Sequence, residues 1–241
     1  MPAESARRAT SESFALAGTT IRRTIVIGWR YLAIGTGLAL LLSLILLVAT
    51  KHGGTAFSMT FPLEIPLFAV LGSMGGLMTF TSDRTKGVFE YLIAYGVRPR
   101  GLFTNGLLAT AAMSAIILGL ALLVGLGAAS ARSVPLTTDL LKAIALYTVP
   151  MSFAGALFTS TVGMIWSSIS TPRAGINSPL GIAPMFGVAP TIFVLIAAES
   201  APTVDYYYIT VGASLAIIAA VVALLAMSAR LMGRERFLSP L

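Results

Sequence analysis

The segment LALLLSLILLVA, Leu38–Ala49, decides the fold class, because it is apolar almost throughout and its residues do not alternate in polarity. Strands of a membrane barrel would alternate between apolar and polar residues over about ten positions. Inside lipid, only helices and closed barrels satisfy every backbone hydrogen bond. The segment therefore predicts a membrane-spanning helix within a helical bundle.

Outward from this segment, the charged residues leave six uncharged windows. Only 10% of the 241 residues are charged, against about 25% in soluble domains. Each window is long enough for a helix to cross the hydrocarbon core, which takes about 20 apolar residues. We predict an all-α polytopic membrane protein with six transmembrane helices, one in each of the windows Tyr31–Thr50, Ile65–Ser82, Gly101–Ala131, Ala143–Pro172, Ala174–Ala198 and Tyr206–Ala229.

The basic residues predict the orientation of these spans, because cytoplasmic loops carry an excess of Lys and Arg. If both termini are cytoplasmic, only Lys51, Arg132 and Lys142 face outward. The other thirteen face the cytoplasm: Arg7, Arg8, Arg22, Arg23, Arg30, Arg84, Lys86, Arg98, Arg100, Arg173, Arg230, Arg234 and Arg236. We predict an N-in, C-in protein of the plasma or inner membrane whose net charge of +7 faces lipid headgroups and not nucleic acid.

The chain divides into three predicted regions. Residues 1–24 are basic, and their apolar residues have helical spacing, which favours an interfacial amphipathic helix over a disordered tail. Residues 25–232 form the membrane domain, whose first apolar run is too long for a signal peptide and is expected to be retained. Residues 233–241 are a cytoplasmic tail. Within the second span, Gly72 and Gly76 are expected to allow close helix packing inside the chain, in preference to a dimer seam.

The segment DRTKGVFEYLIAYGVRPR, Asp83–Arg100, interrupts the apolar windows with six of the chain's 25 charged residues. Gly87 and Gly96 bound a short predicted helix, because glycine favours helix ends. On that helix one stripe has helical spacing and could fill a groove on a soluble partner: Val88, Tyr91, Leu92 and Tyr95.

Catalytic chemistry is not expected in this chain. Its single histidine, His52, lies in a predicted outer loop, it has no cysteine, and no cluster suits a metal. The three lysines, Lys51, Lys86 and Lys142, do not follow a phosphate-binding glycine loop. The spans also lack the ion pairs common in ion-coupled transporters. If ATP provides energy, another polypeptide binds it.

The segment Arg84-Thr85-Lys86-Gly87-Val88-Phe89-Glu90-Tyr91-Leu92-Ile93-Ala94, followed by Arg98-Pro99-Arg100 and the run into Asn105-Gly106, resembles the permease subunits of ABC-type exporters of the second type. The Gly-x-x-Glu step and the basic residues carry this resemblance. Six spans, the preceding amphipathic helix and a proline-rich fifth span also fit. The short outer segment Glu199–Asp205 departs from larger members, which have a re-entrant segment there.

The resemblance implies a transmembrane subunit without an ATP site, paired with a second copy or a homologous permease. A separate ABC ATP-binding subunit would hold ATP and Mg. The implied coupling residues are Arg84, Lys86, Gly87, Val88, Glu90, Tyr91, Leu92 and Tyr95. Glu90 would form an ion pair with Arg22 or Arg23 of the N-terminal helix.

The second and fifth spans line the substrate path in similar transporters. This places Met74, Met78, Met185, Phe186 and Phe193 near the path, although such residues are also common in plain packing. Methionine and aromatic side chains suit a hydrophobic or amphipathic substrate. Two alternatives stay open: a solitary secondary transporter or channel, and a membrane scaffold protein.

Overall fold

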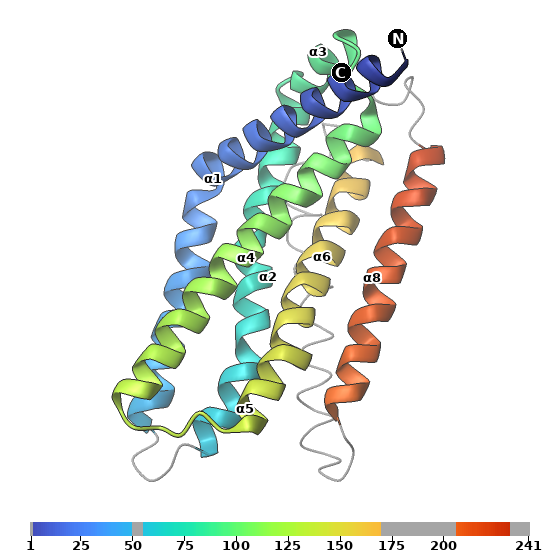
Figure 1. Cartoon of the computed structure of the whole chain (residues 1–241). Helices are drawn as coiled ribbons and strands as arrows, with labels where there is room; N and C mark the ends of the chain where they lie inside the picture. The colour runs from blue at the N-terminus through green and yellow to red at the C-terminus, as the bar shows by residue number, and fades with distance from the viewer. Residues whose placement is uncertain (1, 50–54, 170–205, 232–241) are drawn as a thin grey trace.

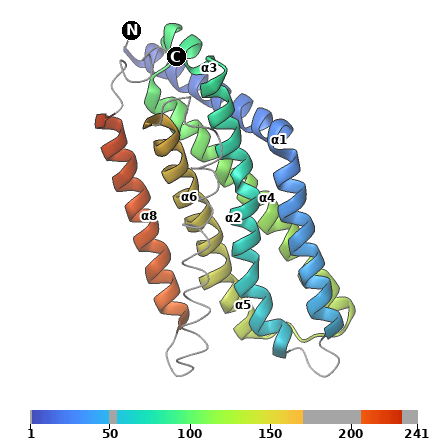
Figure 2. The same cartoon turned by 180° about the vertical axis from the view of Figure 1, so that it is seen from behind.

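A computed structural model describes residues 2–49, 55–169 and 206–231 of the chain. Every regular element in these ranges is a helix, which confirms the all-α prediction for them. Figure 1 shows the long helices side by side in one bundle, with α1 and α8 at opposite sides. The view from behind in Figure 2 shows the same arrangement, with the short helix α3 at one end of the bundle and α5 at the other.

Within the described ranges, four helical stretches are long and apolar enough to cross a membrane, so the chain is a helical membrane protein. They lie in α1 (Pro2–Ala49), in α2 (Thr55–Thr85), in α4 (Pro99–Ala131) and in a fourth stretch, Thr138–Ser167. The fourth stretch is built from α5 (Thr138–Ala143), the π-helix η1 (Ile144–Thr148) and α6 (Val149–Ile169).

The last described helix, α8 (Tyr206–Leu231), coincides with the sixth predicted window and packs along α6. The fifth window, Ala174–Ala198, lies outside the described residues. Helix α1 continues through residue 24, where the sequence suggested a boundary, and its apolar stretch already begins at Gly18. Figure 1 shows that α1 changes direction where its dark-blue first part meets the lighter blue part.

Glycine contacts bring α1, α2 and α4 together. A Cβ atom on Gly28 would lie 3.0 Å from Cα of Gly75, and one on Gly35 would lie 2.9 Å from Cα of Gly72. On the other side of α2, a Cβ on Gly76 would lie 3.1 Å from Cα of Thr110 in α4. Residues without a side chain let helix backbones approach closely in membranes. The Gly72 and Gly76 pair therefore serves packing within the chain.

Two hydrophobic clusters occupy opposite ends of the bundle. The cluster at the α5 end includes Phe57 and Phe61, whose stacked rings have centroids 4.6 Å apart. The cluster at the α3 end joins α2, α3, α4 and α6 and consists of Leu77, Phe80, Phe89, Ile93, Leu102, Phe103, Leu107 and Met164. The short helix α3 is thus part of the bundle's own packing.

The start of α2 differs from the sequence prediction, which placed the second span in the window Ile65–Ser82. Helix α2 begins at Thr55 and contains both Pro62 and Pro66. Proline 66 has no N–H, so it cannot donate to the carbonyl of Pro62 four residues earlier. The hydroxyl of Thr148 donates to that carbonyl instead, at 2.9 Å. A side chain from another helix therefore supplies the bond that the proline removes.

Thr148 is the last residue of the π-helix, where Val149 N–H bonds to the carbonyl of Ile144. Pro150 follows directly and lacks the N–H that would continue an α-helical ladder. The π-helix is rare, occurs mostly as a single turn inside an α-helix, and is frequent at functional sites. The irregular parts of α2 and of the fourth stretch therefore meet at the Thr148 and Pro62 contact.

Candidate functional site: helix α3 and the adjoining pocket

Helix α3 (Val88–Ala94) is bounded by two glycines, as the sequence predicted. Gly87 has φ 72° and Gly96 has φ 90°, a backbone region that side chains with a Cβ rarely adopt. At the C-terminal end, Val97 N–H bonds to the Leu92 carbonyl and Gly96 N–H bonds to the Ile93 carbonyl, both at 3.0 Å. These two bonds are the Schellman arrangement that ends a helix. The chain thus turns sharply on both sides of α3.

One face of α3 is buried in the bundle. Phe89 is 4% exposed and Ile93 is 2% exposed. The ring of Phe89 meets the ring of Phe80 edge-on, with centroids 4.8 Å apart, and Phe80 meets Phe103 in the same way at 5.1 Å. Edge-on contacts of this kind are favourable between aromatic rings. They fix α3 to the ends of α2 and α4.

The opposite face of α3 carries two tyrosines. Tyr91 is 61% exposed and Tyr95 is 73% exposed, and their ring centroids are 4.6 Å apart. A hydrogen bond with the Tyr95 side chain raises the pKa of the Tyr91 hydroxyl. The predicted stripe of four residues therefore divides, because Val88 and Leu92 are partly buried while the tyrosines are exposed.

The basic residues of the segment differ in exposure. Lys86, Arg98 and Arg100 are exposed around the ends of α3, whereas Arg84 is partly buried in the last turn of α2. The exposed tyrosines thus lie between basic side chains on the same end of the bundle.

An ion pair joins α1 to α2 next to α3. Nη2 of Arg23 lies 2.7 Å from Oδ1 of Asp83, and the side chains are 44% and 12% exposed. The partner of Arg23 is therefore Asp83, and not Glu90 as the family resemblance implied. Oε2 of Glu90 is buried and has no hydrogen-bond partner among the described residues. The charge of Glu90 acts on Arg84, in the last turn of α2. Arg22 is exposed on α1.

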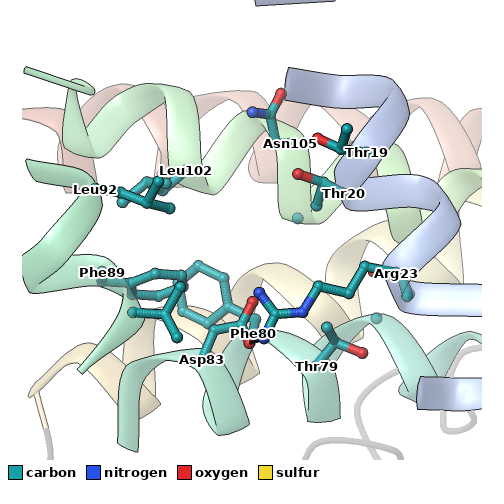
Figure 3. A pocket seen from close by; sticks show the side chains of 14 residues that line it. Thr19, Thr20, Arg23, Thr79, Phe80, Asp83, Phe89, Leu92, Leu102 and Asn105 are labelled. Atoms are coloured by element: carbon teal, nitrogen blue, oxygen red, sulfur yellow. Dashed lines mark ion pairs between the residues drawn. The ribbon is translucent and has the colours of Figure 1, made fainter. Parts of the chain in front are cut away.

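A pocket of about 240 Å³ lies among α1, α2, α3 and α4 at this end of the bundle. Its polar lining is Thr19, Thr20, Arg23, Thr24, Thr79, Asp83 and Asn105, and its apolar lining is Phe80, Val88, Phe89, Leu92 and Leu102, with Gly76 and Gly106. Figure 3 shows Arg23 extending from α1 toward Asp83, with Asn105 beside Thr19 and Thr20. The pocket therefore has one polar wall and one apolar wall.

Asn105 is the most unusual residue in this lining. It is only 8% exposed, yet its side chain has no hydrogen-bond partner among the residues that the structure describes. The side-chain amide has two donors and an acceptor. The amide lines the pocket, where it can bond to water or to a ligand, so it is a candidate recognition group.

Some of the predicted site residues line the pocket, and others do not. Val88 and Leu92 line the pocket together with Arg23. Met74 and Met78 are partly buried on α2 and do not line it. Met185, Phe186 and Phe193 lie outside the described residues. In the described ranges, acidic and histidine side chains do not gather in groups of three that could hold a metal ion.

Sequence reasoning gave no role to Asp83, Phe89, Ile93 or Asn105. Phe89 and Ile93 are apolar and four residues apart, but Val88 and Leu92 have the same spacing, so spacing alone did not identify the buried face. An aspartate close to an apolar span was a usable signal for a charge partner. No family model, no curated protein and no solved structure matches this chain.

Proposed function

We propose that this chain is the transmembrane subunit of an ATP-driven ABC-type exporter. The observation that carries the proposal is the construction of α3. This short helix joins two apolar spans, fixes Phe89 and Ile93 in the bundle, and exposes Tyr91 and Tyr95. Because α3 packs against α2 and α4, a force on its exposed face would be transmitted to both of these helices. Coupling to a partner requires such transmission.

The proposed topology has six spans with both termini in the cytoplasm of a plasma or inner membrane. The excess of basic residues on one side, thirteen against three, supports it. The α3 end of the bundle would then face the cytoplasm, where ATP is available. The fifth span would occupy residues 174–198.

The proposed partner at α3 is a separate ABC ATP-binding subunit. The sequence contains no phosphate-binding loop of its own, so ATP and Mg would bind to the partner. Exposed tyrosines are among the residues that contribute most to protein interfaces. The exposed Lys86, Arg98 and Arg100 would surround the tyrosines and favour an acidic rim on the partner.

The ion pair of Arg23 and Asp83 gives a route from α3 to the N-terminal helix. Asp83 lies in the last turn of α2, four residues before Gly87, and the pocket beside it is lined by α3 residues. In this proposal a displacement of α3 reaches α1 through Asp83. Glu90 would act locally with Arg84.

The proposed cargo is hydrophobic or amphipathic, moved by two permease chains working as a pair. The described spans contain few ionisable groups, and the partly buried Met74 and Met78 offer an adaptable apolar surface. A second copy of this chain or a homologous permease would complete the path.

Purification of the tagged full chain from gently solubilised native membranes tests the proposal. We expect a stoichiometric ATP-binding-cassette subunit to co-purify. A Tyr91→Glu change should remove it, because a charge would replace an aromatic ring at the contact. Leu136→Glu is the matched control, since Leu136 is exposed at the opposite end of the bundle.

The outcomes separate the alternatives. Recovery of the chain without an ATPase, from membranes in which other ABC complexes stay intact, would favour a solitary transporter or channel. An ATPase that binds but drives no ATP-dependent transport in vesicles would favour a scaffold. Equal loss of the partner with Tyr91→Glu and Leu136→Glu would remove α3 from the proposed interface.

A further inference from the structure

The pocket between α1, α2, α3 and α4 contains an unusual combination of groups. Its volume of about 240 Å³ is several times the roughly 30 Å³ that one water occupies in the liquid. One of its walls is polar and the other is apolar. Such a cavity can hold a molecule of several heavy atoms as well as water.

Asn105 contributes an amide that the described protein leaves unpaired. The residue is more than nine-tenths buried and lines the pocket. The amide lines the pocket and can bond to water there. An occupant that offers both a donor and an acceptor can replace that water, whereas an apolar occupant would leave the amide unpaired. This single group therefore specifies the polar part of a ligand.

The charges of the pocket select against ions. Arg23 and Asp83 are the ionisable residues in its lining, and they already neutralise each other at 2.7 Å. A charged ligand would have to break this pair or enter without a partner, and both are costly. The electrostatics thus favour a ligand with no net charge.

The apolar lining of the pocket determines the chemistry of the remaining part of the ligand. Phe80 and Phe89 lie on one side of the pocket with Leu92 and Leu102, as Figure 3 shows. Aromatic and branched side chains provide contacts for a ring or a short branched chain. Leu92 and Phe89 belong to α3, so a bound molecule would contact the underside of that helix.

We propose that this pocket is a binding site for a small uncharged amphiphile, with an amide-like head that pairs with Asn105 and an aryl or branched apolar body that packs on Phe80, Phe89 and Leu92. The site is distinct from the exposed tyrosine face and does not depend on the exporter proposal. Ligand binding is a property of this chain alone and can be measured without an ATPase.

The test uses the full chain in phosphatidylcholine nanodiscs and observes ¹⁹F signals of 4-fluorobenzamide. Empty nanodiscs correct for partition into lipid. We expect saturable binding in the millimolar range, as suits so small a ligand. Fluorobenzene, 4-fluorobenzoate and 4-fluorobenzylammonium should each bind about tenfold more weakly, because they lack the amide or carry a charge.

Asn105→Leu tests the role of the amide directly. This variant should fold like the wild type, because the leucine side chain would lie beside the apolar lining residues Phe80 and Leu102, and it should bind 4-fluorobenzamide about tenfold more weakly. Thr104→Val, at an exposed neighbouring position on α4, should bind like the wild type. If Asn105→Leu is not recovered from membranes, Asn105→Thr replaces it, with a smaller expected loss.

Four results would overturn the proposal. The first is that 4-fluorobenzamide shows no saturable binding to the wild type, which means that water alone occupies the pocket. The second and third are that fluorobenzene binds equally well, or that either charged probe binds better. The fourth is that the Asn105 variant binds 4-fluorobenzamide like the wild type.

Discussion

Arg23 of α1 and Asp83, in the last turn of α2, form an ion pair of 2.7 Å just before the chain turns into α3. A carboxylate near a helix C-terminus is disfavoured by the helix dipole, so the guanidinium has a clear stabilising role. The pair also closes one side of the pocket that contains Asn105.

Breaking this pair should cost stability in a coupled way. We expect Arg23→Gln and Asp83→Asn each to lower the free energy of unfolding by about 1–2 kcal/mol, discounted because Arg23 is nearly half exposed. The double variant should cost less than the sum of the two. Unfolding in detergent micelles measures this, with Arg22→Gln as the control, and strictly additive losses would contradict the pairing.

Two glycines on α1 should respond in opposite ways to the same change. A Cβ on Gly35 would approach Cα of Gly72 to 2.9 Å, whereas a Cβ on Gly37 would have no neighbour within 4 Å in the part of the chain that the structure describes. Gly35→Ala should therefore lower stability by about 1–3 kcal/mol. Gly37→Ala should be neutral or raise it by up to about 1 kcal/mol through helix propensity. Equal effects on the thermal unfolding midpoint would argue against close contact of α1 with α2.

Replacing Ser133 with glycine should raise the stability of the chain. It has φ 57°, and it ends α4 through bonds from Ser133 N–H to Ser130 and from Val134 N–H to Ala129. Glycine adopts this conformation without a Cβ penalty, so Ser133→Gly should raise stability by about 1 kcal/mol. Ser133→Val should lower it. Hydrogen exchange at the Val134 amide reports the same order, and faster exchange in the glycine variant would contradict it.

The two faces of α3 should separate folding from partner binding. Phe89→Ala removes a ring packed against Phe80 and should destabilise the chain by about 3–5 kcal/mol. Tyr91→Ala affects an exposed ring and should change stability by less than about 1 kcal/mol. Unfolding curves of both variants give the comparison. Similar losses would mean that Tyr91 is part of the fold.

The bond between Thr148 and Pro62 should depend on Pro66. Thr148→Val leaves a buried carbonyl unpaired and should cost about 1–2 kcal/mol. In a Pro66→Ala background, the new N–H can reach that carbonyl, and the same change should cost less. Thr161→Val is the control, because its hydroxyl donates to the Leu157 carbonyl within its own helix. A loss that is independent of residue 66 would exclude this explanation.

Much of the fold follows from charge and turn chemistry. The uncharged windows located α1, α2, α4, the fourth stretch and α8, because charges are costly in lipid. Gly87 and Gly96 correctly predicted the two ends of α3. Each has a positive φ, a backbone conformation that glycine adopts readily. Local sequence rules were sufficient at positions where a single residue type determines the backbone conformation.

The inward face of α3 could not be predicted from spacing. Val88 and Leu92, Phe89 and Ile93, and Tyr91 and Tyr95 are all pairs four residues apart, so periodicity offers several faces. The contact with Phe80 and Phe103 chooses between them, and it exists only after α2 and α4 have packed.

Two further features depended on distant partners. The family resemblance paired Glu90 with Arg22 or Arg23, and the packing of α1 on α2 instead brings Arg23 to Asp83. The predicted second span began only at Ile65, and the chain has two prolines there, Pro62 and Pro66, of a residue type that usually ends a helix. Helix α2 continues past them since Thr148, 86 residues along the chain from Pro62, bonds to the freed carbonyl.

The hydrogen bond from Thr148 to the Pro62 carbonyl makes positions 66 and 148 depend on each other in evolution. A related chain without proline at the position of Pro66 would regain its own helix bond, and the position of Thr148 would then be released from its need for a hydroxyl. Proline at the first position and a hydroxyl at the second should accordingly be inherited or lost together.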